Sequence, residues 1–376
     1  MFSPKVEMQF RYLVCSIVIL AVLPATVFAQ SVGVLANAVA PLTTPTPDGS
    51  GQVTEPSIVQ FPFRWHGFKY WLVLAPFPHS DAADENPSIL VSDDGQHWSI
   101  PPGGRNPIQE PAPLSHLADS SLFFDLISDQ LWLYYISEDQ FGITNVLRTV
   151  SGDGIHWSTP QVVLRAPDYQ VVMPAVAKIG DQYWLWSVNA GNAGCSASST
   201  FVQYRTSSDG VHWSPPQLTD IAQPGFRIWH IGVTELHFLI SRPGGSNQLT
   251  NDGRLPDQFP ENGPPSDDQV VLSPPIYAML ASAYENDCGD TVLFLSLSQD
   301  GVHWGHFPRP LLTPDHGHWD GQAIYQSTMA LDSATDLMTV WYSAWTPTQE
   351  GPSWHLGVTQ GNYFRTLHDL LEVPAP

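Results

Sequence analysis

The stretch Ser92-Asp-Asp-Gly-Gln-His-Trp98 decides the fold, because the same pattern recurs three more times. The other copies begin at Ser151, Ser207 and Ser298, and all four fit Ser-x-Asp-Gly-x-His-Trp. Each copy ends a run rich in strand-forming residues, and Asp-Gly is the turn chemistry of a tight hairpin. The final tryptophan offers a large flat surface to a neighbouring unit. The sequence therefore predicts one supersecondary unit repeated along the chain.

The spacing of the copies predicts blades of four short strands. The repeat tryptophans lie 59, 56 and 91 residues apart, and residues 241–275, crowded with Gly, Pro, Asn and Asp, account for the longest interval as a loop insertion in blade four. A fifth unit starts at Trp319 and lacks the hairpin, so we expect residues 32–40 to supply its last strand. Four-stranded antiparallel units repeated radially predict an all-β fold, a five-bladed β-propeller. An open solenoid and a two-sheet sandwich are the alternatives, and no helical pattern of useful length is found.

Residues 1–29 have the regions of a secretory signal peptide. Lys5 and Arg11 precede an apolar run over residues 12–23, and small residues end at Ala29. The apolar run is too short for a membrane span. We expect export to the periplasm or the extracellular space, with residues 30–376 forming a single propeller domain.

The net charge of the chain limits the classes of molecule it can bind, and its cysteines predict a disulfide. The 376 residues include 14 Lys and Arg against 36 Asp and Glu, a net charge of −22, which disfavours nucleic acid and anionic lipid surfaces. Cys195 and Cys288 remain after the signal is removed, and each lies between the second and third strands of its repeat. Because such loops are neighbours in adjacent blades and export permits oxidation, we expect a disulfide.

At this point the hairpins resemble the Asp-box-like turns of five-bladed propeller glycoside hydrolases, the group that contains families 43, 62, 32, 68, 117 and 130. The resemblance covers roughly residues 50–362 and implies a glycoside hydrolase. A resemblance to family 43 implies three catalytic residues. An Asp from blade one would act as general base, an Asp from blade two would orient and tune the others, and a Glu from blade three would act as general acid. Glu55 and Asp119 stand at the first two positions, but blade three offers Met173-Pro174. The usual acid is therefore missing.

Polar residues where innermost strands begin should converge on the propeller axis. His230 is the preferred acid, since imidazole titrates near neutrality, and Glu85, from a loop on the same face, is the second choice. The four repeat histidines are read as turn residues, because they lie on different blades and cannot converge on a metal. The predicted catalytic residues are Asp119, His230, Glu55 and Glu85, and the predicted substrate-binding residues are Asp320, Arg227, Trp229, Trp319 and Glu138.

The sequence thus predicts a secreted, monomeric glycoside hydrolase that acts on an oligosaccharide or polysaccharide, with inversion weakly favoured. Asp320 and Arg227 would hold hydroxyls or a carboxylate, and an aromatic such as Trp65, Phe77, Trp229 or Trp319 would stack on a sugar ring. No catalytic cofactor or metal is expected, and a structural calcium in the channel is left open. The missing blade-three Glu favours one alternative, a non-catalytic propeller that binds glycans or a surface partner. A second alternative is a lyase that uses His230 as base on a uronic acid.

Overall fold

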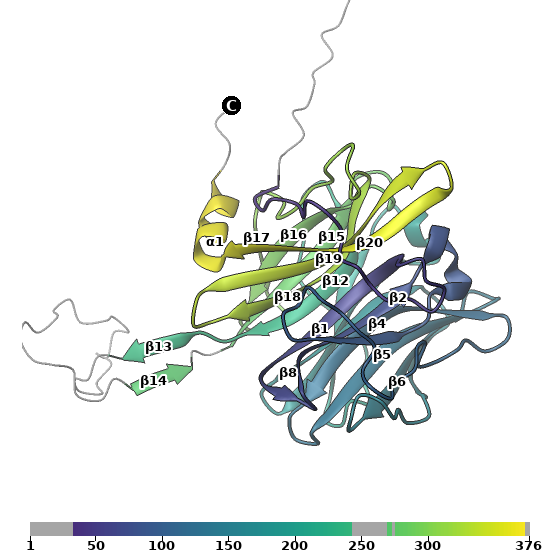
Figure 1. Ribbon diagram of the computed structural model, residues 1–376, viewed down its shortest axis with the longest axis horizontal. Helices are drawn as coiled ribbons and strands as arrows, with labels where there is room; N and C mark the ends of the chain where they lie inside the picture. The colour runs from purple at the N-terminus through teal and green to yellow at the C-terminus, as the bar shows by residue number, and fades with distance from the viewer. Residues whose placement is uncertain (1–32, 243–268, 273–274, 373–376) are drawn as a thin grey trace, which may run out of the picture. The chain divides into compact units, whose positions relative to one another are not determined.

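The computed structural model describes residues 33–242, 269–272 and 275–372, and these form a five-bladed β-propeller (Figure 1). The innermost strands of successive blades contact one another in chain order, and the last contacts the first, so the ring is closed. The expected signal peptide and most of the insertion at 241–275 lie outside the described residues. None of the described helices is long and apolar enough to cross a membrane.

Each blade is an antiparallel sheet whose strands follow chain order from the axis outward. The strands, blade by blade, are β1 (Val53–Trp65), β2 (Phe68–Pro76) and β3 (Ser88–Ser92); β4 (Ser115–Asp125), β5 (Gln130–Asp139), β6 (Thr144–Ser151) and β7 (Gln161–Ala166); β8 (Val171–Ile179), β9 (Gln182–Asn189), β10 (Phe201–Ser207) and β11 (Gln217–Leu218); β12 (Arg227–Leu236), β15 (Ile276–Tyr284), β16 (Val292–Ser298) and β17 (Gly305–His306); β18 (Ala323–Asp332), β19 (Leu337–Thr348) and β20 (Gly351–Asn362). A separate pair, β13 (Leu239–Arg242) and β14 (Gln269–Leu272), follows the far end of β12 and projects from the blades in Figure 1.

The Asp-Gly hairpins fasten each of blades one to four to the blade before it, an arrangement we call the hairpin lock. In blade one, the indole N–H of Trp341 donates to the carbonyl of Gly95 at 2.7 Å, and in blade four that of Trp186 donates to Gly301 at 2.8 Å. A Cβ on any of the four hairpin glycines would lie within 3 Å of a ring of the preceding blade. The pairs, each with the glycine first, are Gly95 with Trp341, Gly154 with Trp71, Gly210 with Trp132, and Gly301 with Trp186.

The repeat histidines are structural residues of the hairpin turns, as predicted. In blade four, Asp300 accepts hydrogen bonds from the backbone amides of Val302 and His303 and lies 2.7 Å from the Nδ1 atom of His303. The same distance recurs at the other three hairpins. Because all four imidazoles are largely exposed and on separate blades, they form no common site.

The N-terminal segment closes the seam between blades four and five, but not as the expected strand. Leu35 donates its amide to the carbonyl of Leu311 in blade four, and Leu42 donates to Leu356 of β20. Residues 33–52 contain no assigned strand. The segment therefore crosses from one blade to the other and cannot follow β20 as a ladder partner.

One helix contradicts the expectation that none is present. α1 (Tyr363–Leu371) is capped by Asn362, whose side chain accepts from the backbone amide of Arg365. Tyr363, Thr366 and Leu370 are buried on one face. The apolar pattern spans little more than two turns, which is too short to stand out in the sequence.

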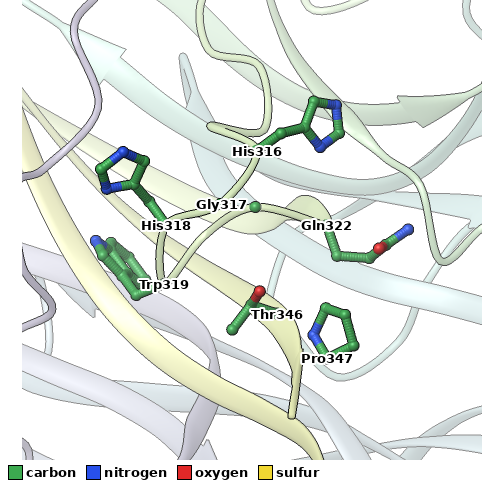
Figure 2. A pocket seen from close by; sticks show the side chains of 8 residues that line it. His316, Gly317, His318, Trp319, Gln322, Thr346 and Pro347 are labelled. Atoms are coloured by element: carbon green, nitrogen blue, oxygen red, sulfur yellow. The ribbon is translucent and has the colours of Figure 1, made fainter.

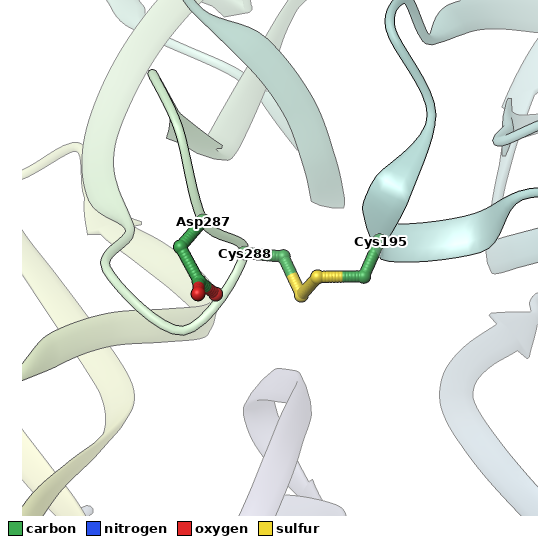
Figure 3. Close-up of side chains that lie close together, drawn as sticks. All are labelled: Cys195, Asp287 and Cys288. Carbon is green, nitrogen blue, oxygen red and sulfur yellow. A yellow bond between two sulfur atoms is a disulfide. The ribbon is translucent and has the colours of Figure 1, made fainter.

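The predicted disulfide is present. Cys195, in the short 3-10 helix η3 (Gly194–Ser196) after β9, is bonded to Cys288, in the loop between β15 and β16, with a Cα–Cα distance of 5.5 Å (Figure 3). The bridge joins blades three and four at the end of the propeller where the innermost strands begin.

Candidate active site

A β-bulge interrupts the innermost strand of every blade near its start. The residues left out of register are Glu55-Pro56, Asp119-Ser120, Met173-Pro174, Trp229 and Tyr325-Gln326. Bulges re-aim side chains and are frequent beside active sites. The backbone φ angles of Glu55, Asp119 and Met173 are 59°, 56° and 51°. Each such non-glycine residue costs about 1–3 kcal/mol, so strain is concentrated at this end of the axis.

The bulges bring carboxylates and an imidazole together in what we call the central cluster, Glu55, Glu85, Asp119 and His230. The Oδ1 atom of Asp119 lies 3.1 Å from Nε2 of His230, and its Oδ2 accepts from the amide of Met173 at 2.9 Å. The amide of Asp119 donates to Oε2 of Glu55 at 2.6 Å. Glu55, Asp119 and His230 are each at most 4% exposed. The structure therefore gathers all four predicted catalytic residues at the axis.

Glu85 joins the cluster through Glu55. It follows the short 3-10 helix η2 (Ala82–Asp84), is buried, and shares a side-chain hydrogen bond with Glu55. Burial raises the pKa of Glu85 to about 8, and burial together with the charges of Glu85 and Asp119 raises the pKa of Glu55 well above its usual value. Burial acts in the same direction on Asp119, but the hydrogen bond and charge of His230 outweigh it and lower the pKa of Asp119. The anionic carboxylate of the cluster is therefore Asp119.

His230 has one nitrogen engaged and one free. Nε2 faces Asp119, which favours the tautomer that donates from Nε2, while the buried Nδ1 has no hydrogen-bond partner among the described residues. A buried imidazole that is oriented by a carboxylate and has a free lone pair is the arrangement of a general base.

Tyr325 is a site residue that the sequence analysis missed. Its hydroxyl accepts from the indole N–H of Trp229 at 3.0 Å, and its ring centroid lies 4.2 Å from that of His230. Burial raises the pKa of Tyr325 well above 10, so the phenol stays neutral and keeps a proton to donate. The fifth innermost strand was expected to begin at Trp319 but begins at Ala323, which puts Tyr325 at the bulge.

Three members of the central cluster also fit a metal ion. One ligand atom from each of Glu55, Asp119 and His230 lies within 4.8 Å of the others. Carboxylate oxygen with imidazole nitrogen is a donor set that suits first-row divalent cations. The sequence predicts no catalytic cofactor, whereas this donor set is suited to a divalent cation.

The predicted substrate-binding residues are spread over three blades. Asp320 is fully buried, and its Oδ2 accepts from Asn37 and from the Tyr342 hydroxyl at 2.8 and 2.9 Å. Trp319 donates its indole N–H to the carbonyl of Ala38 and stacks on the Tyr342 ring. Both residues thus hold the loop that precedes β18.

The remaining binding candidates lie at blades two and four. Arg227 donates to the carbonyl of Glu285, with its guanidinium 4.7 Å from the Tyr284 ring centroid. Glu138 is half-buried and accepts from the side chain of Gln170 at 3.4 Å. Trp229 is the member of this group that contacts the central cluster, through its ring beside His230.

Trp65 was one of the aromatics expected to stack on a sugar at the pocket mouth, and the structure contradicts this. It is the last residue of β1, at the opposite end of that strand from Glu55, and it is buried. Its indole N–H donates to Asp129 at 2.9 Å. β1 runs for 13 residues, which is longer than the sequence pattern indicated and carries Trp65 to the far face.

A hollow of about 610 Å³ lies in blade five, between the loop before β18 and the end of β19 (Figure 2). In Figure 2 the side chains of the loop lie on one side and Thr346 and Pro347 on the other. The lining residues are His316, Gly317, His318, Trp319, Gly321, Gln322, Thr346 and Pro347.

Comparison with known proteins identifies similar carbohydrate-active enzymes. No protein-family model matches the chain. It is 29% identical over 339 residues to the A type blood N-acetyl-alpha-D-galactosamine deacetylase of Flavonifractor plautii, covering 78% of this chain and 40% of the relative. The chain thus spans about two fifths of that relative's length.

Solved structures show the same fold. An N-acetylgalactosamine deacetylase from F. plautii in complex with blood group B trisaccharide superposes with a TM-score of 0.75 at 24% identity, covering 92% of this chain and all of that one. The alpha-L-arabinofuranosidase PaAbf62A of Podospora anserina gives 0.52 at 13% identity, covering 88% and 98% of the two chains. The GH32 beta-fructofuranosidase BmSUC1 of Bombyx mori gives 0.52 at 13% identity, covering 87% and 63%. The chain therefore has the five-bladed propeller fold of this group of glycoside hydrolases and of the deacetylase.

Proposed function

We propose that this protein is a carbohydrate-active hydrolase that removes the acetyl group from an N-acetylated amino sugar. The observation that carries the proposal is the environment of His230: buried, oriented through Nε2 by Asp119, and free at Nδ1. The similarity to a deacetylase of N-acetylgalactosamine supports the choice of bond.

In the proposed reaction His230, Asp119 and Tyr325 have separate roles. Nδ1 of His230 accepts a proton from water as the water oxygen attacks the acetamide carbonyl carbon, and Asp119 stabilises the imidazolium that forms. The neutral Tyr325 hydroxyl donates a hydrogen bond to the carbonyl oxygen, where negative charge develops. His230 then returns the proton to the nitrogen as the C–N bond breaks, and the products are acetate and a free amino sugar. If Glu55, Asp119 and His230 held a divalent cation, the cation would instead supply Lewis-acid polarisation of the carbonyl, and His230 would be a ligand in place of the base.

Glycoside hydrolysis, the reaction predicted from the sequence, is the second candidate. The raised pKa of Glu85, about 8, favours it, because a general acid must be protonated near neutrality. However, Glu55 is hydrogen-bonded to Glu85 and to Asp119, so the three carboxyl groups form one contiguous cluster. Glycosidases place their two carboxyls about 5 to 9.5 Å apart on opposite sides of the bond. Glu55 is therefore too close to either neighbour to form an opposed pair with it.

The test is to incubate the purified protein with oligosaccharides that end in N-acetylgalactosamine or N-acetylglucosamine and to analyse the products by mass. We expect acetate and the de-N-acetylated oligosaccharide of unchanged length. His230→Ala and Asp119→Asn should lower the rate by at least about 100-fold. His306→Ala, an exposed residue on the outer strand β17, is the matched control and should leave the rate unchanged.

Other products would decide between the alternatives. Shortened sugars would replace the deacetylase proposal by glycoside hydrolysis, and binding without any product would favour a non-catalytic propeller. A parallel assay with EDTA, followed by addition of Zn²⁺ or Mn²⁺, tests the cation: loss and recovery of activity would show that the cluster acts as a metal centre.

A further inference from the structure

The hollow in blade five lies within reach of the central cluster. Gln322 lines the hollow, and Tyr325 follows three residues later on β18. At 3.2–3.4 Å per residue along a strand, the two Cα atoms are separated by about 10 Å. Trp345 and Trp354 bridge the interval: their rings stack at 5.8 Å, and Trp354 packs 5.0 Å from Tyr325. The hollow therefore lies at the same end of blade five as Tyr325, the residue whose ring packs on His230.

The lining of the hollow suits an uncharged, hydroxyl-rich ligand. None of its eight lining residues is Asp, Glu, Lys or Arg, although the chain has 36 acidic and 14 basic residues. The lining holds imidazole, amide and hydroxyl groups, the chemistry that hydrogen-bonds with hydroxyls, together with the rings of Trp319 and Pro347. The amide nitrogen of Gln322 already donates to Asp290, and His318 lies 3.9 Å from Asp315. An ion would find no charged partner among these residues, whereas a neutral sugar finds both hydrogen bonds and an apolar surface.

The hollow is preformed. Asp320 is anchored to Asn37 and Tyr342, and Trp319 is anchored to Ala38. A Cβ on Gly321 would meet backbone atoms of three loop residues at 3.0–3.1 Å, so the loop is tightly folded on itself. Because the loop is already ordered by buried contacts, a ligand loses little free energy in organising it.

We propose that this hollow, the blade-five subsite, binds a neutral sugar residue of the same oligosaccharide whose acetamido sugar reacts at the central cluster. The inference rests on the proposed function and deepens it: the substrate is an oligosaccharide of at least two sugar units. Asp320 and Trp319, predicted from sequence as binding residues, act here mainly by holding the subsite in shape.

The experiment compares two substrates, a monosaccharide glycoside of the acetamido sugar and a trisaccharide that ends in that sugar and continues with neutral hexoses. The wild-type protein should deacetylate the trisaccharide with a kcat/KM at least about tenfold higher. His318→Ala and Thr346→Val should each remove most of that advantage, chiefly through KM, and leave the monosaccharide rate unchanged. His318 has a side chain 63% exposed, so its truncation does not disturb the core. His306→Ala is again the control.

Equal rates on the two substrates, or equal losses on both in the variants, would overturn the subsite while leaving the deacetylase intact. If the wild type releases no acetate from either substrate, the proposed function fails, and the subsite is then tested by titration of the full chain with lactose. Binding that His318→Ala weakens would support the subsite, and no binding by the wild type would overturn it.

Discussion

Asp119 occupies a backbone conformation that few aspartates adopt, and its contacts explain why it is kept there. Its amide donates to Glu55, one carboxylate oxygen accepts from Met173, and the other orients His230. The same residue therefore links the innermost strands of blades one, three and four. A regular strand at this position would turn the side chain away from at least one of these partners.

Tyr325→Phe isolates the contribution of the phenol hydroxyl. The ring contacts with His230 and Trp354 are retained, but the hydrogen bond to the developing charge is lost. We expect kcat to fall by about 100-fold with little change in KM. Steady-state kinetics on the trisaccharide would measure this, and circular dichroism would check the fold. An unchanged kcat would remove Tyr325 from the mechanism.

The hairpin aspartates make stability depend on pH in acid. The amide of His97, its imidazole and the amide of Gln96 lower the pKa of Asp94 below its usual 3.8. A lowered folded-state pKa gives stability that is present above pH 3.8 and is lost as pH falls through the folded-state value. Asp94→Asn should therefore lower Tm at pH 7, and the difference should shrink below pH 3. A Tm difference that is independent of pH between 7 and 2 would contradict this.

Three residues of the central cluster could be placed at innermost strand starts from the sequence, but Tyr325 could not. The difference lies in the loop that precedes each strand. Glu55, Asp119 and His230 follow directly on the blade pattern, because each lies within three residues of a predicted strand start. In blade five, Gly317 and Gly321 allow a folded loop before β18, which delays the strand by four residues relative to Trp319. Whether a polar residue meets the axis depends on the bulge, and a bulge has no signature in a single sequence.

At the scale of elements, the hairpin lock predicts a contrast within one turn. A Cβ on Gly154 would lie 2.0 Å from the ring of Trp71, and the φ of Gly154 is +72°, so Gly154→Ala should cost about 3 kcal/mol. Gly152 lies two residues earlier with nothing within 4 Å of a built Cβ, so Gly152→Ala is the matched control and should be nearly neutral. Urea unfolding of both variants measures the difference, and equal midpoints would refute the lock.

The disulfide between Cys195 and Cys288 closes 93 residues of chain. In the chain-entropy account a loop of this size is worth about 4.6 kcal/mol. The double variant Cys195→Ser, Cys288→Ser should therefore unfold at a clearly lower urea concentration than the wild type. The wild type measured under reducing conditions should match the double variant. Stability unaffected by either treatment would show that the bridge contributes nothing.

At the scale of the molecule, a segment that belongs to no blade holds blades four and five together. The described N-terminal segment bonds to Leu311 of blade four and to Leu356 of blade five, and Asn37 donates to Thr313 and to the buried Asp320. The sequence predicts that this segment supplies the last strand of the fifth blade, but it makes hydrogen bonds to two separate blades and forms no strand ladder. A strand pattern cannot reveal a segment whose partners lie about 280 and 320 residues away in the chain.

Asn37→Ala tests this connection between blades four and five. It leaves the buried carboxylate of Asp320 with one donor fewer, which should cost about 1–3 kcal/mol. Hydrogen exchange should report faster opening of β20 than of β5, on the far side of the ring. Uniform acceleration in all blades would contradict a local seam.

The hairpin lock also has a consequence for adding blades to the propeller or removing them, because its two halves lie in different blades. Each tryptophan is covered by a glycine of the next blade, so a single blade excised at its own strand boundaries carries an uncovered indole and an unused turn. One complete lock is contained in the segment that runs from the second strand of one blade through the hairpin of the next blade. A blade inserted into the ring therefore keeps the lock only where its predecessor supplies the tryptophan and its successor supplies the glycine.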